Sequence, residues 1–200
     1  MTDRQTLDVY AERAADYANN FASDGPDRHL REFIALVPAG GKVLDLGCGP
    51  AAASMHMRDA GLDPDPIDAS PEMVALANER YKIGARLGTF DDIEGSAEYA
   101  GVWANFSLLH AAREKLPLHF GAISQALIPG GIVHIGMKTG QGTRRDALGR
   151  SYTYVSVDEL TQMLLTSGLV PNYTHEGAEA GLAGTIDPFV IMRAQKDPNA

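Results

Sequence analysis

The sequence has a single cysteine, Cys48, among 200 residues, so no intrachain disulfide can form and no cysteine cluster can hold zinc. Its six histidines are too scattered for two of them to share one helix face as metal ligands, and we expect no metal. Basic residues are few, with 17 Lys and Arg against 26 Asp and Glu and a net charge of -9. Because phosphate contacts need clustered Lys and Arg, this balance argues against nucleic acid as a partner.

Long hydrophobic runs are missing as well. The amino terminus has no apolar signal core, and no run approaches the roughly 18 residues that span a bilayer. We therefore expect a cytoplasmic protein without a membrane partner, present as a monomer or a homodimer. With 44% hydrophobic residues, a chain of 200 residues can bury a substantial core, and we expect one domain over residues 1–200.

The most informative stretch is residues 42–50, Lys-Val-Leu-Asp-Leu-Gly-Cys-Gly-Pro. Its short apolar run predicts a buried strand, and Gly47 and Gly49 then allow a tight turn against which a ligand can press. The alanine-rich residues 51–55 favour a helix whose first amides point back at the turn. This sequence of elements is typical of a nucleotide-type pocket. A buried strand with a packing turn and no ligand is the alternative.

Two cofactor families use such a pocket. Gly47, Gly49 and Ala52 fit a G-x-G-x-x-A dinucleotide motif, with Asp68 placed 21 residues after Gly47 for a ribose hydroxyl. This pattern leaves a nicotinamide-dependent oxidoreductase open. Asp45, two residues before the first glycine, favours the other family, because its carboxylate can bind a ligand ammonium and would repel a pyrophosphate.

Four motifs resemble those of the class I S-adenosylmethionine-dependent methyltransferases, and they follow one another in the order found in that family. They are the glycine motif at 43–49, the acidic run Asp-Ala-Ser-Pro-Glu-Met at 68–73, the stretch Asn-Phe-Ser-Leu-Leu-His at 105–110, and the Pro-Gly-Gly turn at 129–131. In the wording and order of these motifs, the chain is most similar to small bacterial members of the family, including tellurite-resistance-like ones. The resemblance implies an α/β fold: a three-layer, Rossmann-like, mostly parallel seven-stranded sheet with an antiparallel C-terminal hairpin.

Local patterns predict the elements of such a fold. Ser70 suits an N-cap and Pro71 a first helical position, so a helix should begin just after Asp68. Helices are expected at 7–21, 28–37, from 51, from 70, at 116–127 and after 156, and strands at 43–46, 64–68, 85–88, 101–106, 132–137, 169–176 and 186–194. Residues 138–154 are expected to be a loop.

By the resemblance, one group of residues holds S-adenosylmethionine. Asp45 and the glycine turn would take the methionyl end, Asp68 the ribose, and Met73 the adenine face. The full predicted set is Tyr17, Asp45, Gly47, Cys48, Gly49, Asp68, Ala69, Met73, Thr89, Phe90, Asp91 and Asn105. Met73 as a core residue and Asp91 as a helix cap remain alternatives.

A second group is predicted to meet the methyl acceptor. Residues 1–38 would form a helical lid, whose Tyr10 and Tyr17 line the pocket or simply pack, and residues 138–155 a substrate-side loop. That loop carries Lys138, Arg144, Arg145, Arg150 and Tyr152, and its basic side chains favour an anionic acceptor, although a solvated loop is the alternative.

His110, near the end of the fourth predicted strand, is the candidate catalytic base, or else a histidine packed at a helix start. The Asn-Phe-Ser-Leu stretch lacks the proline pair of family members that methylate planar amino groups. We therefore predict methyl transfer from S-adenosylmethionine to a small metabolite. A protein that binds this cofactor without turnover, and a nicotinamide-dependent oxidoreductase, are the alternatives.

Overall fold

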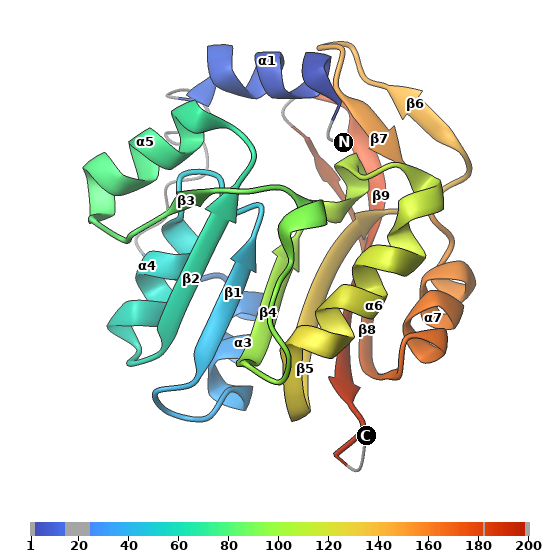
Figure 1. Cartoon of the computed structure of the whole chain (residues 1–200). Coiled ribbons are helices and arrows are strands. Elements are labelled where there is room, and N and C mark those ends of the chain that lie inside the picture. The colour runs from blue at the N-terminus through green and yellow to red at the C-terminus, as the bar shows by residue number, and fades with distance from the viewer. Residues whose placement is uncertain (1–2, 15–24, 182, 199–200) are drawn as a thin grey trace.

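The computed structural model describes residues 3–14, 25–181 and 183–198 (Figure 1). The first predicted helix is seen as α1 (Arg4–Glu12), which begins three residues earlier than expected because Asp3 caps it, accepting from the Thr6 backbone amide. The rest of the predicted 7–21 helix, with Tyr17, lies outside the described residues.

A seven-stranded sheet forms the middle layer, in the order β3-β2-β1-β4-β5-β9-β8. The first five strands are parallel, and β9 runs antiparallel to both of its neighbours. Their bounds are β1 (Lys42–Leu46), β2 (Asp63–Asp68), β3 (Arg86–Leu87), β4 (Tyr99–Asn105), β5 (Leu127–Lys138), β8 (Leu169–Ala180) and β9 (Ile186–Lys196). The predicted sheet with its antiparallel hairpin is confirmed. The inserted β9 distinguishes it from the all-parallel order 3-2-1-4-5-6 of dinucleotide-binding sheets.

Helices cover both faces of the sheet because successive strand residues point to opposite sides. Val43 and Trp103 pack against one helical layer, and their neighbours Leu44 and Val102 against the other. The first layer contains α3 (Arg28–Leu36), α4 (Ala52–Asp59) and, beside α4, α5 (Pro71–Tyr81); the second contains α6 (Leu116–Ala126) and α7 (Val157–Thr166). The three-layer prediction is therefore confirmed.

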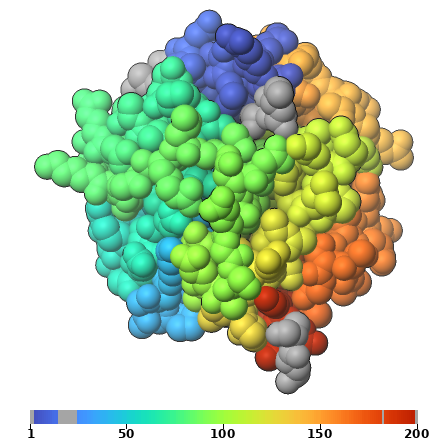
Figure 2. Space-filling model, in the orientation of Figure 1, coloured from blue at the N-terminus to red at the C-terminus, as the bar shows by residue number. Residues whose placement is uncertain are grey.

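The parallel strands all end at the edge of the sheet that α1 crosses (Figure 1). In the space-filling view, α1 lies on the surface between the segment that contains α5 and the hairpin of β6 (Thr143–Arg145) and β7 (Ser151–Thr153) (Figure 2). This is the edge of an open α/β sheet at which ligands bind.

Two expectations about local structure were wrong. Residues 138–154 are not a continuous loop, because β6 and β7 pair as an antiparallel hairpin within them. The Pro-Gly-Gly residues at 129–131 do not precede the fifth strand but form an irregularity inside β5, where the register with β4 shifts between Tyr99 and Gly101. Among the described residues, no helix has the length and apolar character needed to cross a membrane.

Candidate active site

Three adjoining cavities lie along the carboxyl ends of β1, β2 and β4. The residues that line the first include Asp68, Met73, Phe90, Tyr10 and His110. The second meets the first at Gly47, Gly49 and Asn105 and contains Asp45. The third meets the first at Tyr10, Phe106 and His110 and extends to Lys138 and Tyr152.

Asp68 stands at the end of β2, and local backbone groups fix its carboxylate in the first cavity. Its Oδ2 accepts from the Gly49 amide at 2.8 Å and its Oδ1 from the Ser70 amide at 2.9 Å. Each oxygen keeps a second lone pair for a ligand hydroxyl. Burial raises the pKa of this carboxyl, while the backbone hydrogen bonds oppose the rise. The helix that starts at Pro71, capped by the Ser70 side chain as predicted, holds the arrangement in place.

Asp45, at the end of β1, is a buried acid, and no Lys or Arg of the described residues pairs with it. Its side-chain partner is Ser54 in the first turn of α4, whose Oγ donates to Oδ2 at 2.7 Å. Burial, with a smaller contribution from the charge of Asp68, raises the pKa of Asp45 to about 7. A ligand ammonium in the second cavity would compensate this buried charge.

The turn after β1 is shaped by close packing. Gly47 has a φ of +75°, and a Cβ on it would lie 2.5 Å from the Cβ of Ser107. Ser107 follows Phe106, which itself adopts a left-handed φ of +54°, a conformation that costs of order 1–3 kcal/mol and is concentrated at functional sites. The Ser107 Oγ is buried and has no hydrogen-bond partner within the described part of the chain, and Ser107 lines the first cavity.

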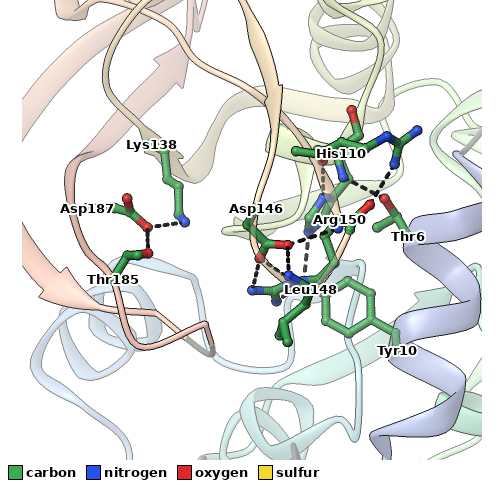
Figure 3. A network of polar contacts seen from close by, with 12 residues as sticks. Thr6, Tyr10, His110, Lys138, Asp146, Leu148, Arg150, Thr185 and Asp187 are labelled. Atoms are coloured by element: carbon green, nitrogen blue, oxygen red, sulfur yellow. Dashed lines mark hydrogen bonds and ion pairs between the residues drawn. The ribbon is translucent and has the colours of Figure 1, made fainter.

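His110 is the centre of a hydrogen-bonded network that joins three elements (Figure 3). Its Nε2 lies 2.8 Å from the hydroxyl of Tyr10 on α1, and its Nδ1 lies 2.8 Å from the carbonyl oxygen of Ser151 on β7. The Tyr10 hydroxyl also accepts from Arg150 at 3.1 Å. Burial lowers the pKa of His110 to about 4, so the imidazole is neutral at pH 7.

Carboxylates already pair with three of the four predicted acceptor-side cations. Lys138 lies 2.5 Å from Asp187 and 4.0 Å from the centre of the Tyr152 ring, in the third cavity. Arg150 forms a buried pair with Asp146 at 2.7 Å. Outside the cavity, Arg145 binds Asp3 and ties β6 to α1, while the exposed Arg144 packs over Tyr154.

The other predicted cofactor residues divide between the cavities. Ala69, Met73, Thr89 and Phe90 line the first, Cys48 the second, and Asn105 both. Asp91 lines neither of them: it faces a small neighbouring pocket and pairs with Lys115 at 2.8 Å. The cap of the short helix at 90–92 is Thr89, together with Asp92 rather than Asp91.

The site also contains residues that the sequence reasoning did not select. They are Thr6, whose hydroxyl accepts from the Ser151 amide, together with Ser54, Phe106 and Ser107. Ser107 could have been selected, because it directly follows the end of a parallel strand, where ligand contacts gather. Ser54 and Thr6 depend on tertiary contacts that no local pattern records. Among the described residues, no three His, Cys, Asp or Glu side chains form a group that could hold a metal.

Comparisons with known proteins agree with this architecture. A methyltransferase domain family matches residues 43–131. The ubiquinone biosynthesis O-methyltransferase of Xanthomonas axonopodis pv. citri is 32% identical over 93 residues, which are 40% of this chain and 38% of that protein. The curated relatives are matched over only 37% to 53% of their own length.

Two solved structures show the same fold along nearly the whole chain. One is the Burkholderia thailandensis 1,6-didemethyltoxoflavin-N1-methyltransferase with bound 1,6-didemethyltoxoflavin and S-adenosylhomocysteine, 19% identical, with a TM-score of 0.72 over 96% of this chain and 88% of that one. The other is a TehB-like methyltransferase from Corynebacterium glutamicum, also 19% identical, with a TM-score of 0.69 over 98% of this chain and 100% of that one.

A methyltransferase domain is thus matched over residues 43–131, and the sheet order is the one that the resemblance to class I S-adenosylmethionine-dependent methyltransferases implies. The predicted fold and the methyltransferase domain are therefore confirmed. The tellurite-resistance-like subgroup stays a prediction.

Proposed function

We propose that the chain binds S-adenosylmethionine across the first and second cavities and transfers its methyl group to a small metabolite in the third. The observation that carries this proposal is that the first and third cavities meet at Tyr10, Phe106 and His110. A methyl group held in one cavity then faces an acceptor in the other.

The residues present fit this cofactor on chemical grounds. Asp68 offers two free lone pairs to the ribose hydroxyls, and Phe90 and Met73 offer apolar surface to adenine. Asp45 offers a buried carboxylate to the methionyl ammonium. The unpartnered Ser107 Oγ supplies one further polar contact between these ends.

The cofactor supplies an activated methyl group, so the protein mainly has to align the acceptor. Correct orientation of two reactants can lower a barrier by about 7–11 kcal/mol. His110, neutral and hydrogen-bonded through Nδ1, would take the acceptor's proton at Nε2, where it now contacts the Tyr10 hydroxyl. Lys138 would receive an anionic group of the acceptor in exchange for Asp187, its partner in the third cavity.

Calorimetry with S-adenosylmethionine, followed by a search for S-adenosylhomocysteine release over a metabolite panel, tests the proposal. Binding and turnover are expected. Binding without turnover on any metabolite would favour a cofactor-binding protein. A calorimetric binding signal with NAD and none with S-adenosylmethionine would favour the oxidoreductase and overturn the proposal.

The raised pKa of Asp45 predicts how cofactor affinity depends on pH. Below pH 7 the free protein holds this carboxyl protonated, whereas an ammonium partner requires it ionised, so binding releases a proton. Affinity is therefore expected to rise about tenfold between pH 5.5 and 7, as the ionised fraction grows toward one half. Calorimetry in two buffers of different ionisation enthalpy measures the released proton. Asp45→Asn should bind more weakly with a flat profile, and a flat wild-type profile would contradict this assignment.

A further inference from the structure

The hydroxyl of Tyr10 occupies the junction of the first and third cavities, where the polar side chains around it include His110, Arg150 and Tyr152 (Figure 3). His110 Nε2 lies 2.8 Å away and Arg150 Nη1 lies 3.1 Å away. Tyr10 is brought there by α1, while His110 and Arg150 come from segments at least 100 residues further along the chain. Tyr10, His110 and Arg150 therefore come together only when α1 is packed over the junction of the two cavities.

The direction of each hydrogen bond follows from chemistry. The Ser151 carbonyl can only accept, so His110 Nδ1 carries the ring proton. In the neutral imidazole Nε2 is then an acceptor, and the Tyr10 hydroxyl must donate to it. Arg150 can only donate, so the same hydroxyl oxygen accepts from the guanidinium. The junction therefore suits a hydroxyl oxygen that donates a hydrogen bond to His110 and accepts one from the Arg150 guanidinium.

We propose that the Tyr10 hydroxyl stands where the acceptor's own hydroxyl binds, and that the acceptor is a phenol methylated on oxygen. This inference rests on the proposed function and names the reacting group. The Tyr10 side chain moves away when the acceptor enters. The acceptor hydroxyl then donates to His110 Nε2 and accepts from Arg150 in its place.

The surroundings of Tyr10 favour a planar ring. The Arg150 guanidinium lies 5.3 Å from the centre of the Tyr10 ring and 5.2 Å from that of Tyr152. The Tyr152 and His110 ring centres are 4.8 Å apart. Cation–π attraction and edge contacts of this kind select an aromatic ring over a flexible aliphatic alcohol.

The chemical step balances with these two side chains. The phenolic oxygen forms a bond to the methyl carbon with its own electron pair, and the carbon–sulfur bond breaks with its pair left on sulfur. The O–H proton passes to His110 Nε2. His110 is a weak base, but this suffices because the proton grows strongly acidic as the carbon–oxygen bond forms. Arg150 donates to the same oxygen and so fixes its position and orientation before the methyl arrives.

Other acceptor groups use the junction less well. An ammonium cannot accept from Arg150, and like charges repel. An ionised carboxylate can accept from Arg150 but has no proton for His110 Nε2. An aromatic amine can donate to Nε2, but its nitrogen is a poor acceptor for the guanidinium.

Tyr10→Ala tests the inference, because it removes the phenol and leaves both partners in place. Phenol, aniline and toluene are titrated into the purified variant by calorimetry, without cofactor. Phenol is expected to bind at least about tenfold more tightly than toluene, since one of its two hydrogen bonds is to a charged group. It should also bind more tightly than aniline, and more tightly to the variant than to the wild type, where Tyr10 holds the place. Tyr10→Leu serves in the same titrations if the alanine variant does not fold.

A double variant, Tyr10→Ala with His110→Phe, provides the control, and its preference for phenol over toluene should largely disappear. Equal binding of phenol and toluene to Tyr10→Ala, a preference for aniline, or binding of none of the three would overturn the inference. Cofactor binding by the wild type is measured separately. If it persists while phenol fails, the phenol assignment falls and the proposed function stands; if it is absent, the proposed function itself falls.

Discussion

Replacing Gly47 with alanine is expected to weaken cofactor binding strongly and to destabilise the fold. The new Cβ would lie 2.5 Å from the Cβ of the buried Ser107, and the left-handed φ of +75° adds its own strain. Overpacking costs about 1–3 kcal/mol and the left-handed conformation about 1–2 kcal/mol, so the free energy of unfolding should fall by about 2–5 kcal/mol. Because relief requires the turn to move away from the first cavity, affinity for S-adenosylmethionine should drop at least about 100-fold. Denaturant unfolding and calorimetry measure the two effects.

Gly61→Ala provides the matched control. Gly61 has a similar φ of +84°, but an added Cβ would meet no atom of the described residues within 4 Å. This variant should therefore lose only the conformational part of the stability, about 1–2 kcal/mol, and should bind the cofactor normally. If both variants behaved alike, close packing of the turn against Ser107 would not be what shapes the pocket.

Asp68→Asn is the second change with a large expected effect. The carboxylate accepts from the Gly49 and Ser70 amides at once, whereas an asparagine amide would turn its NH₂ group toward one of these donors. The variant also loses a charged acceptor for the ribose hydroxyls, and hydrogen bonds to charged groups contribute about 1.5–3 kcal/mol each. A loss of about 3 kcal/mol in binding free energy, or about 100-fold in affinity, is expected by calorimetry.

Asp65→Asn, three residues earlier on β2, separates this effect from a general weakening of the strand. Asp65 pairs with Arg86 at 2.9 Å and accepts from the Tyr99 hydroxyl, away from all three cavities. It should change stability modestly and leave cofactor affinity within about twofold of the wild type. Normal binding by Asp68→Asn would remove Asp68 from the proposed site.

The sequence allowed prediction of those parts of the fold that local chemistry determines. The acid at the end of β2, the Ser70 cap and Pro71 specify a strand, a turn and a helix start within a few residues, and the structure has each of them. The buried strands β1 and β4 were likewise predictable, because runs such as Val43–Leu46 leave few alternatives to a central strand.

The hairpin of β6 and β7 could not be predicted, because its strands have three residues each and all three residues of β6 are exposed. Contacts far apart in sequence hold it: Arg145 binds Asp3, and the Ser151 amide donates to Thr6. The carboxylate partners of Lys138 and Arg145 were missed for the same reason, since composition shows a basic stretch but not which acids lie beside it. The hairpin side of the candidate site could not be predicted mainly because its contacts join residues that are far apart in the sequence, and only in part because its local signal is weak.

Tyr10 belongs to both the first and the third cavity, and this has a consequence for the order of events in a catalytic cycle. A displacement of α1 that moves Tyr10 away would open the first and the third cavity at the same time. Under the proposed function, release of the spent cofactor and release of the methylated product would both depend on this one movement, and its frequency would set an upper limit on turnover.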